Sequence, residues 1–109
     1  QAIFFDPTVG CSGCHAPPYY GGGTPPDVGT ATSTEAPTGG KAFDVPSLLG
    51  VSQTAPYLHD GSAATLFDVL GATGEPTKPG GYLPKKTMGN SWFLDEQERR
   101  DLVSFLLTL

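Results

Sequence analysis

The sequence predicts a mainly α-helical fold whose short helices are joined by long loops rich in glycine and proline. Near the C-terminus, Leu102, Phe105 and Leu106 follow the i, i+3, i+4 spacing of one helix face. No stretch of useful length alternates apolar and polar residues as a half-buried strand does. The chain holds 15 Gly and 11 Pro among 109 residues, about twice their share in an average sequence. Because glycine and proline interrupt helices and strands, this content limits regular structure to short segments.

The first part of the chain predicts one short helix and one long loop. Asp6 followed by Pro7 is a favourable helix start, with Asp as the N-cap, so a helix is expected from about Pro7 that ends near residues 10–13. Residues 16–42 are dominated by Gly, Pro, Thr and Ser and show no helical or strand period. Loops of that length are uncommon in compact domains. Such a loop is either disordered or wrapped around a bound object. Its tyrosines can pack against such an object, which favours the second alternative.

The middle of the chain predicts a helical turn, a short helix and a second loop. Residues 46–49 begin with Pro and precede Gly50, which is typical of a single helical turn. Ser62 is expected to cap a helix that ends at Gly71. Residues 72–90 are again rich in Gly and Pro and predict a loop.

The last helix has the clearest signal. Asp95 as N-cap with Glu98 three residues later forms a capping-box pattern, and the apolar face that follows extends to Leu109. A chain of this length is close to the usual size of one domain. We therefore expect a single domain over residues 1–109.

Composition excludes several classes of protein. The 11 acidic and 6 basic residues give a net charge of -5. A nucleic-acid surface needs clustered Lys and Arg, so we expect no nucleic-acid binding. The chain has no run of about 18 apolar residues, so the sequence predicts no membrane span. The start at Gln1 is consistent with a processed mature protein or an excised domain. Only 38% of residues are hydrophobic, so we expect something other than side chains to complete the core.

Cys11-Ser12-Gly13-Cys14-His15 is a CxxCH motif, the attachment signature of c-type haem. Two thiols three positions apart on one turn can add to the two vinyl groups at one edge of a porphyrin, and the adjacent imidazole then reaches the iron. We therefore predict one covalently bound haem c on Cys11 and Cys14, with His15 as an axial ligand. The alternatives are a disulfide, a thioredoxin-like redox pair, whose βαβ context is absent, and a zinc site, which lacks a second ligand pair.

The sixth position of the iron separates an electron carrier from an enzyme, and the sequence offers three candidates for it. Met88 is the first choice, because it is the single methionine and lies in the loop before the last helix, from which a thioether closes the second haem face in His/Met cytochromes c. The alternative role of Met88 is to fill a gap in the core. His59 is the second choice, since histidine is a common metal ligand. An open site that admits peroxide is the third.

Several further strings resemble the bacterial di-haem cytochrome c peroxidase and MauG-like family. They are residues 45–50 (VPSLLG), 54–62 (TAPYLHDGS), 64–66 (ATL), 3–6 (IFFD), the CSGCH pentapeptide, 27–30 (DVGT), and Leu94-Asp95 with the last helix. Together they look like the C-terminal haem domain of that family and span most of the chain. Family members carry two CxxCH motifs on two domains, and this chain has one, which excludes two-haem peroxidase chemistry within it.

The motif and the resemblance together imply a class I-like cytochrome c domain with long Gly/Pro-rich loops around one haem. The resemblance places His59 at the haem edge or its propionates, and Tyr57, Phe67, Trp92 and Phe93 are expected to cover the haem or fill the core. The expected function is one-electron transfer between redox partner proteins. A peroxidase-like haem domain and a relay module of a larger dehydrogenase are the alternatives. Because thioether attachment takes place outside the cytoplasm, we expect export to the periplasm or the cell exterior.

Overall fold

The computed structural model of the chain describes residues 1–28, 42–71 and 90–109. These residues form the helices α1 (Ala2–Phe5), α2 (Cys11–Cys14), α3 (Leu66–Leu70) and α4 (Glu96–Leu106), with the 3-10 turns η2 (Val51–Gln53) and η3 (Ser91–Phe93). In the same residues, β structure is confined to two isolated bridges, Asp27 with Ala42 and Tyr57 with Ala63. The mainly α prediction is thereby confirmed for the described residues.

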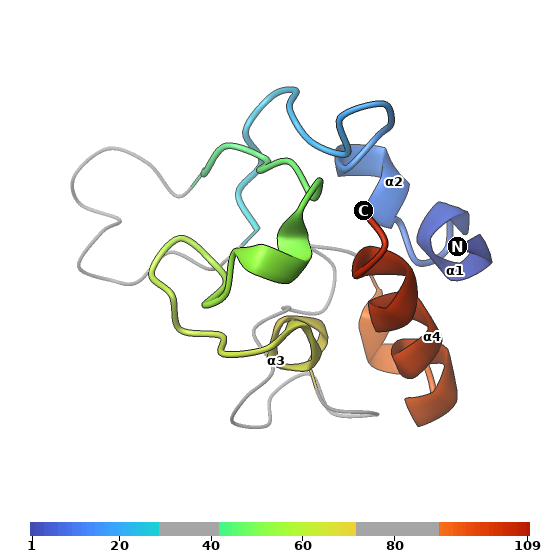
Figure 1. Cartoon of the computed structure of the whole chain (residues 1–109). Coiled ribbons are helices and arrows are strands. Elements are labelled where there is room, and N and C mark those ends of the chain that lie inside the picture. The colour runs from blue at the N-terminus through green and yellow to red at the C-terminus, as the bar shows by residue number, and fades with distance from the viewer. Residues whose placement is uncertain (29–41, 72–89) are drawn as a thin grey trace.

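The two ends of the chain pack against each other. In Figure 1, α1 and α3 lie on opposite sides of α4, and both contact it. The ring centroids of Phe4 in α1 and Phe105 in α4 are 5.3 Å apart. The buried core draws apolar side chains from these helices and from the segments between them: Phe4, Val9, Val51, Leu66, Leu70, Leu94, Leu102, Val103 and Leu106. In the described ranges, no helix has the length and apolarity needed to cross a membrane.

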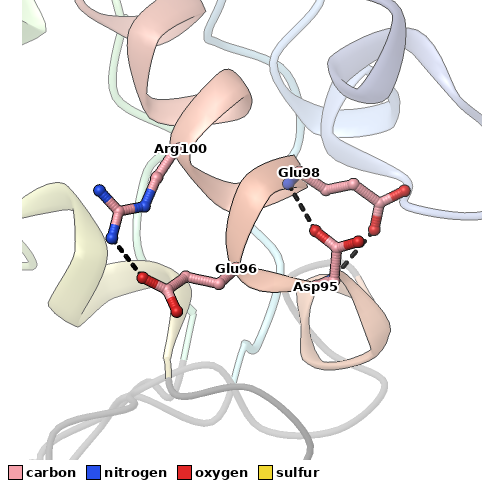
Figure 2. Close-up of polar contacts among 4 residues, drawn as sticks. All are labelled: Asp95, Glu96, Glu98 and Arg100. Carbon is pink, nitrogen blue, oxygen red and sulfur yellow. Dashed lines mark hydrogen bonds and ion pairs between the residues drawn. The ribbon is translucent and has the colours of Figure 1, made fainter.

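Helix α4 begins where the sequence predicts. The Asp95 carboxylate accepts a hydrogen bond from the Glu98 amide at 2.8 Å, and the Glu98 carboxylate accepts one from the Asp95 amide at 2.9 Å, as Figure 2 shows. Glu96 and Arg100 form an ion pair one turn apart on the exposed side of the helix. The helix ends at Leu106 instead of Leu109, because the last residues form tighter turns.

Helix α3 ends at Gly71 as predicted, but its N-cap is Thr65 and not Ser62. The Thr65 hydroxyl accepts a hydrogen bond from the Asp68 amide at 3.2 Å, and the Asp68 carboxylate accepts one from the Thr65 amide at 2.7 Å. Ser62 instead donates its amide and hydroxyl to the Asp60 carboxylate. The expected cap is wrong because the Ser62 side chain is already engaged in this local turn.

The prediction of a helix from Pro7 is also wrong. Asp6 is the residue that follows α1, and its carboxylate accepts hydrogen bonds from the amide and the hydroxyl of Thr8. The turn that results leads through Gly10, at φ 84°, into α2. An Asp carboxylate can bond a helix start or a local turn equally well, and here the turn wins.

The expected helical turn over residues 46–49 is displaced along the chain. The backbone of Val45 accepts a hydrogen bond from Gly22 at 2.9 Å, and the amide of Leu48 donates to Tyr20 at 3.1 Å. These long-range bonds hold the segment open, so the helical turn begins only after Gly50, at Val51. Gly50 therefore precedes the turn instead of ending it, with a φ of 72° that suits glycine.

Candidate functional site

A cavity of about 540 Å³ lies between α2, α3, α4 and the segments 43–48 and 54–59. Apart from Leu94 and Val103, every side chain of the core cluster lines it. The volume falls within the roughly 300–1,000 Å³ of small-molecule and cofactor sites. The chain thus builds its core around a space for a largely apolar group.

Helix α2 presents both cysteines to this cavity. Cys11 and Cys14 lie one turn apart, line the cavity wall and are free thiols. Burial raises the pKa of Cys11 to about 11, so this thiol is protonated at neutral pH. Cys14 is exposed at the cavity rim. The two sulfurs are therefore set along one edge of the cavity, one inside and one at its border.

His15 follows α2 directly and also lines the cavity. Its Nδ1 lies 3.0 Å from the carbonyl oxygen of Tyr20, and because a carbonyl can only accept, Nδ1 must carry the proton. Burial lowers the pKa of His15 and so favours the neutral ring. A neutral imidazole with its proton fixed on Nδ1 keeps the lone pair of Nε2 for a metal ion.

The Tyr20 carbonyl oxygen has a second donor. It accepts a hydrogen bond from the Leu48 amide at 3.1 Å as well as the one from His15. The close approach of the two segments requires Gly21, since a Cβ there would lie 2.5 Å from the Pro46 carbonyl oxygen. The orientation of the His15 ring therefore depends on how residues 45–48 pack on residues 20–22.

Tyr57 and His59 line another part of the cavity wall. The Tyr57 hydroxyl donates a hydrogen bond to the Val51 carbonyl oxygen at 3.0 Å. The His59 ring is exposed and stacks on Phe43, with ring centroids 3.9 Å apart and planes at 15°. The structure thus brings both residues to the cavity with the two cysteines and His15.

Met88 lies outside the described residues, and so does the predicted loop that carries it, apart from Asn90. Asn90 itself lines the cavity and is tied to the turn before α2. Its amide donates to the Val9 carbonyl oxygen at 2.8 Å, and its side-chain amide donates to the Thr8 carbonyl oxygen at 2.7 Å. The end of the segment that carries Met88 is therefore anchored at the cavity wall.

Two of the aromatic expectations are wrong. Phe67 and Phe93 are exposed, at 43% and 46% of their surface, and neither lines the cavity. Phe67 follows the buried Leu66 in α3, and Phe93 precedes the buried Leu94, so both rings point away from the core. The side chain of Trp92 lies outside the description. The aromatic residues found at the cavity, besides Tyr57, are Phe4 and Phe43.

Arg99 on α4 is a buried cation that was not predicted from the sequence. Its exposed fraction is 5%, and its guanidinium donates to the carbonyl oxygens of Gly71 and, at 3.4 Å, Leu94. Beside it, the Ser91 hydroxyl donates to the Leu70 carbonyl oxygen at 2.9 Å. These bonds join the end of α3 to the start of the last segment. A signal was present, since Arg99 lies on the same helix face as Leu102, Val103 and Leu106.

The donor set fits a covalently attached porphyrin better than the alternatives. Both thiols face one apolar cavity, next to an imidazole whose free nitrogen suits iron. Within residues 1–28, 42–71 and 90–109, no three His, Cys, Asp or Glu side chains converge into a metal-ion site. The zinc alternative therefore finds no ligand set there.

Comparison with known proteins agrees with this fit. The cytochrome c family profile matches residues 1–109. The chain is 39% identical over 85 residues to a cytochrome-c peroxidase, IdrP1, of Denitromonas iodatirespirans, and 31% identical over 116 aligned positions to the methylamine utilization protein MauG of Methylorubrum extorquens. These alignments cover 76% and 96% of this chain, but only 22% and 32% of the two relatives.

A solved structure shares the fold over the whole chain. Hydrazine synthase of Kuenenia stuttgartiensis matches with a TM-score of 0.73 and 27% identity, covering 100% of this chain and 44% of that one. The gamma subunit of that enzyme is also 35% identical over 69 residues, which is 63% of this chain and 17% of the subunit. The chain thus spans a minor part of each of these proteins. The profile match over its full length and the single Cys11–Cys14 motif in the cavity wall show that the chain belongs to the cytochrome c family and binds covalently attached haem c.

Proposed function

We propose that the chain is a mono-haem electron carrier in which His15 and Met88 are the two axial ligands of the iron. The observation that carries the proposal is the hydrogen bond between His15 and Tyr20 at the wall of an apolar cavity. It holds one imidazole lone pair ready for the iron beside the two attachment thiols. Bound haem supplies a one-electron Fe(III)/Fe(II) couple. The protein contributes ligands and a low-dielectric surrounding that keep the reorganisation of solvent small.

Asn90 supports Met88 as the sixth ligand. It is two residues from Met88 in the chain and lies in the cavity wall, bound to Val9 and Thr8. Two residues of extended chain span at most about 7 Å. The place of Asn90 is therefore compatible with ligation of the iron by Met88.

His59 is the weaker candidate for the iron. Its ring is exposed and stacked flat on Phe43 at the cavity border, so ligation would require the stack to break. A place beside an edge of the cofactor, as the family resemblance implies, needs no such change. We therefore assign Tyr57 and His59 to the surroundings of the haem and not to the iron.

Replacement of the candidate ligands tests the assignment. Ferric Met-ligated haem has a weak sulfur-to-iron absorption band at the red end of the visible spectrum, and Met88→Ala should abolish this band. His59→Ala is the matched control and should retain it. Absence of the band from the wild-type protein, or its persistence in Met88→Ala, would overturn the choice of Met88.

The peroxidase-like alternative rests on the name of one relative, a cytochrome-c peroxidase. It requires an open sixth position, so the ferric protein would be high-spin and would bind cyanide readily. Under the carrier proposal the wild-type protein is low-spin, and cyanide binds only after the sixth ligand is displaced. The same spectra therefore decide between the two functions.

Attachment of haem through thioethers also bears on location. We propose that the chain works in the periplasm or at the cell exterior, where this attachment takes place, and exchanges electrons with redox proteins there. Fractionation of cells followed by haem staining tests the location. Haem-stained chain in the cytoplasmic fraction alone would contradict it.

A further inference from the structure

Two segments beside the cavity lack charged residues altogether. Residues 7–26 and 45–58 contain no Asp, Glu, Lys or Arg, although the chain has 17 such residues elsewhere. The nearest charged residues in the chain, Asp6, Asp27, Asp44 and Asp60, flank the two segments on either side. The exposed parts of these two segments therefore present neither carboxylates nor basic side chains to a partner.

The two segments form one continuous surface. The Ser47 hydroxyl donates to the Tyr19 carbonyl oxygen at 2.6 Å and accepts from the Leu49 amide at 3.2 Å, so one side chain joins Tyr19 to Leu49. Main-chain bonds between residues 20–22 and 45–48 continue the junction. We call the exposed residues at this junction the uncharged face: Cys14, Pro18, Tyr19, Pro46, Ser47 and Leu49.

The uncharged face exposes large apolar side chains. Tyr19 is 70% exposed and Leu49 is 46% exposed. Aromatic residues are enriched at the centre of protein interfaces and carry much of the binding energy there, so the exposed ring of Tyr19 suits the centre of such an interface.

This face is also the outer side of the cofactor cavity. Cys14, Pro46 and Ser47 line the cavity and belong to the face. The carbonyl group of Tyr20, next to Tyr19 in the chain, accepts the hydrogen bond from His15. One hydrogen bond and one peptide unit therefore separate the exposed Tyr19 from the imidazole assigned to the iron.

We propose that the uncharged face is the docking surface for a redox protein whose own contact area is uncharged and apolar. This proposal rests on the proposed function as an electron carrier. A charged group of a partner placed against this face would lose its water and find no opposite charge among the described residues of the face, which is costly. The complementary partner surface must therefore be neutral, and attraction of opposite charges does not guide its approach.

Electron transfer to a blue-copper protein tests the proposal. The probe is one whose copper site opens on an uncharged apolar patch, and one electron passes from the reduced haem-loaded protein to Cu(II), giving Cu(I) without proton transfer. The rate is measured by stopped flow from about 0.01 M to about 1 M ionic strength, over which the Debye length falls from about 30 Å to about 3 Å. We expect the rate to change by less than about threefold, since oppositely charged partners show a steep fall.

Variants locate the contact. Tyr19→Lys and Leu49→Lys should each lower the rate, and the affinity measured by calorimetry, about tenfold, as expected for loss of a central contact. Phe67→Lys and Leu107→Lys introduce the same charge at exposed apolar positions outside the face and should change both by less than about twofold. A steep salt dependence, or no difference between the two pairs of variants, overturns the proposal.

Two further measurements separate this proposal from the proposed function. All four variants should keep the optical spectrum of the wild-type protein and its reduction by dithionite, which needs no docking. An open sixth position in the spectrum would refute the carrier assignment, while the calorimetric affinities would still report on the face. Sedimentation that shows dimers lost only in Tyr19→Lys and Leu49→Lys would assign the face to a second copy of the chain and overturn the choice of partner.

Discussion

Replacement of Arg99 by Met should lower the free energy of unfolding by about 2 kcal/mol. The guanidinium donates to the carbonyl oxygens of Gly71 and Leu94 and is almost completely buried. Each buried acceptor that loses its donor costs about 1–3 kcal/mol, with the Gly71 bond carrying most of it because the Leu94 contact is long. Against this loss, Met removes a cation whose pKa is lowered by burial and whose Nε has no hydrogen-bond partner within residues 1–28, 42–71 and 90–109. The two effects leave a net loss of about 2 kcal/mol.

The neighbouring residue supplies a matched control for this experiment. Arg100 has the same side chain on the same helix, but it is exposed and pairs with Glu96 one turn away. Solvent screens an exposed pair of this kind and leaves it little effect on stability, so Arg100→Met should have a small effect. The measurement is the urea midpoint of the haem-loaded proteins, followed by circular dichroism at comparable m-values. If Arg99→Met and Arg100→Met agree to within about 0.5 kcal/mol, the role assigned to the buried guanidinium is wrong.

Three further changes follow from local contacts. Leu102→Ala should lower the free energy of unfolding, measured in urea, by about 3 kcal/mol, because this side chain is fully buried at the cavity wall. A loss below about 1 kcal/mol would refute that placement. Gly21→Ala should lower the melting temperature, since its Cβ would lie 2.5 Å from the Pro46 carbonyl oxygen, whereas Gly13→Ala, with nothing within 4 Å, should not. Hydrogen bonds hold the pKa of Asp60 below its ordinary 3.8, so its stabilisation is present above pH 3.8 and is lost as the pH falls through the lower folded value. Acid titrations of wild type and Asp60→Asn should therefore converge at low pH and differ above it.

Local signals predicted some elements well. The side chains of Asp95 and Glu98 bond to each other's backbone, so the start of α4 depends on four consecutive residues and could be predicted from them. The same pattern exists at Thr65 and Asp68, three residues after Ser62, whose side chain bonds to Asp60 and does not cap α3. Where two polar side chains compete for one cap, the sequence alone does not decide between them.

The candidate site also contains residues that the sequence predicts and residues that it does not. Cys11, Cys14 and His15 are neighbours in the chain, so their common place at the cavity followed directly from the motif. Phe43 and Arg99 reach their partners over 16 and 28 positions of sequence, and no local spacing indicates such contacts. The choice of Met88 as an iron ligand and the single domain over residues 1–109 stay predictions.

The cavity that the core surrounds has a consequence for how the protein is made. Seven of the nine side chains of the core cluster line the cavity, so without haem each of them lacks packing partners on that side, which lowers the stability of the fold. The bare polypeptide therefore has little folded state to reach before its prosthetic group arrives. The attachment motif consists of the five consecutive residues CSGCH, so its two thiols can be presented to haem before the rest of the chain folds. Maturation would then precede folding, and a haem-free preparation with native helical circular dichroism would contradict this order of events.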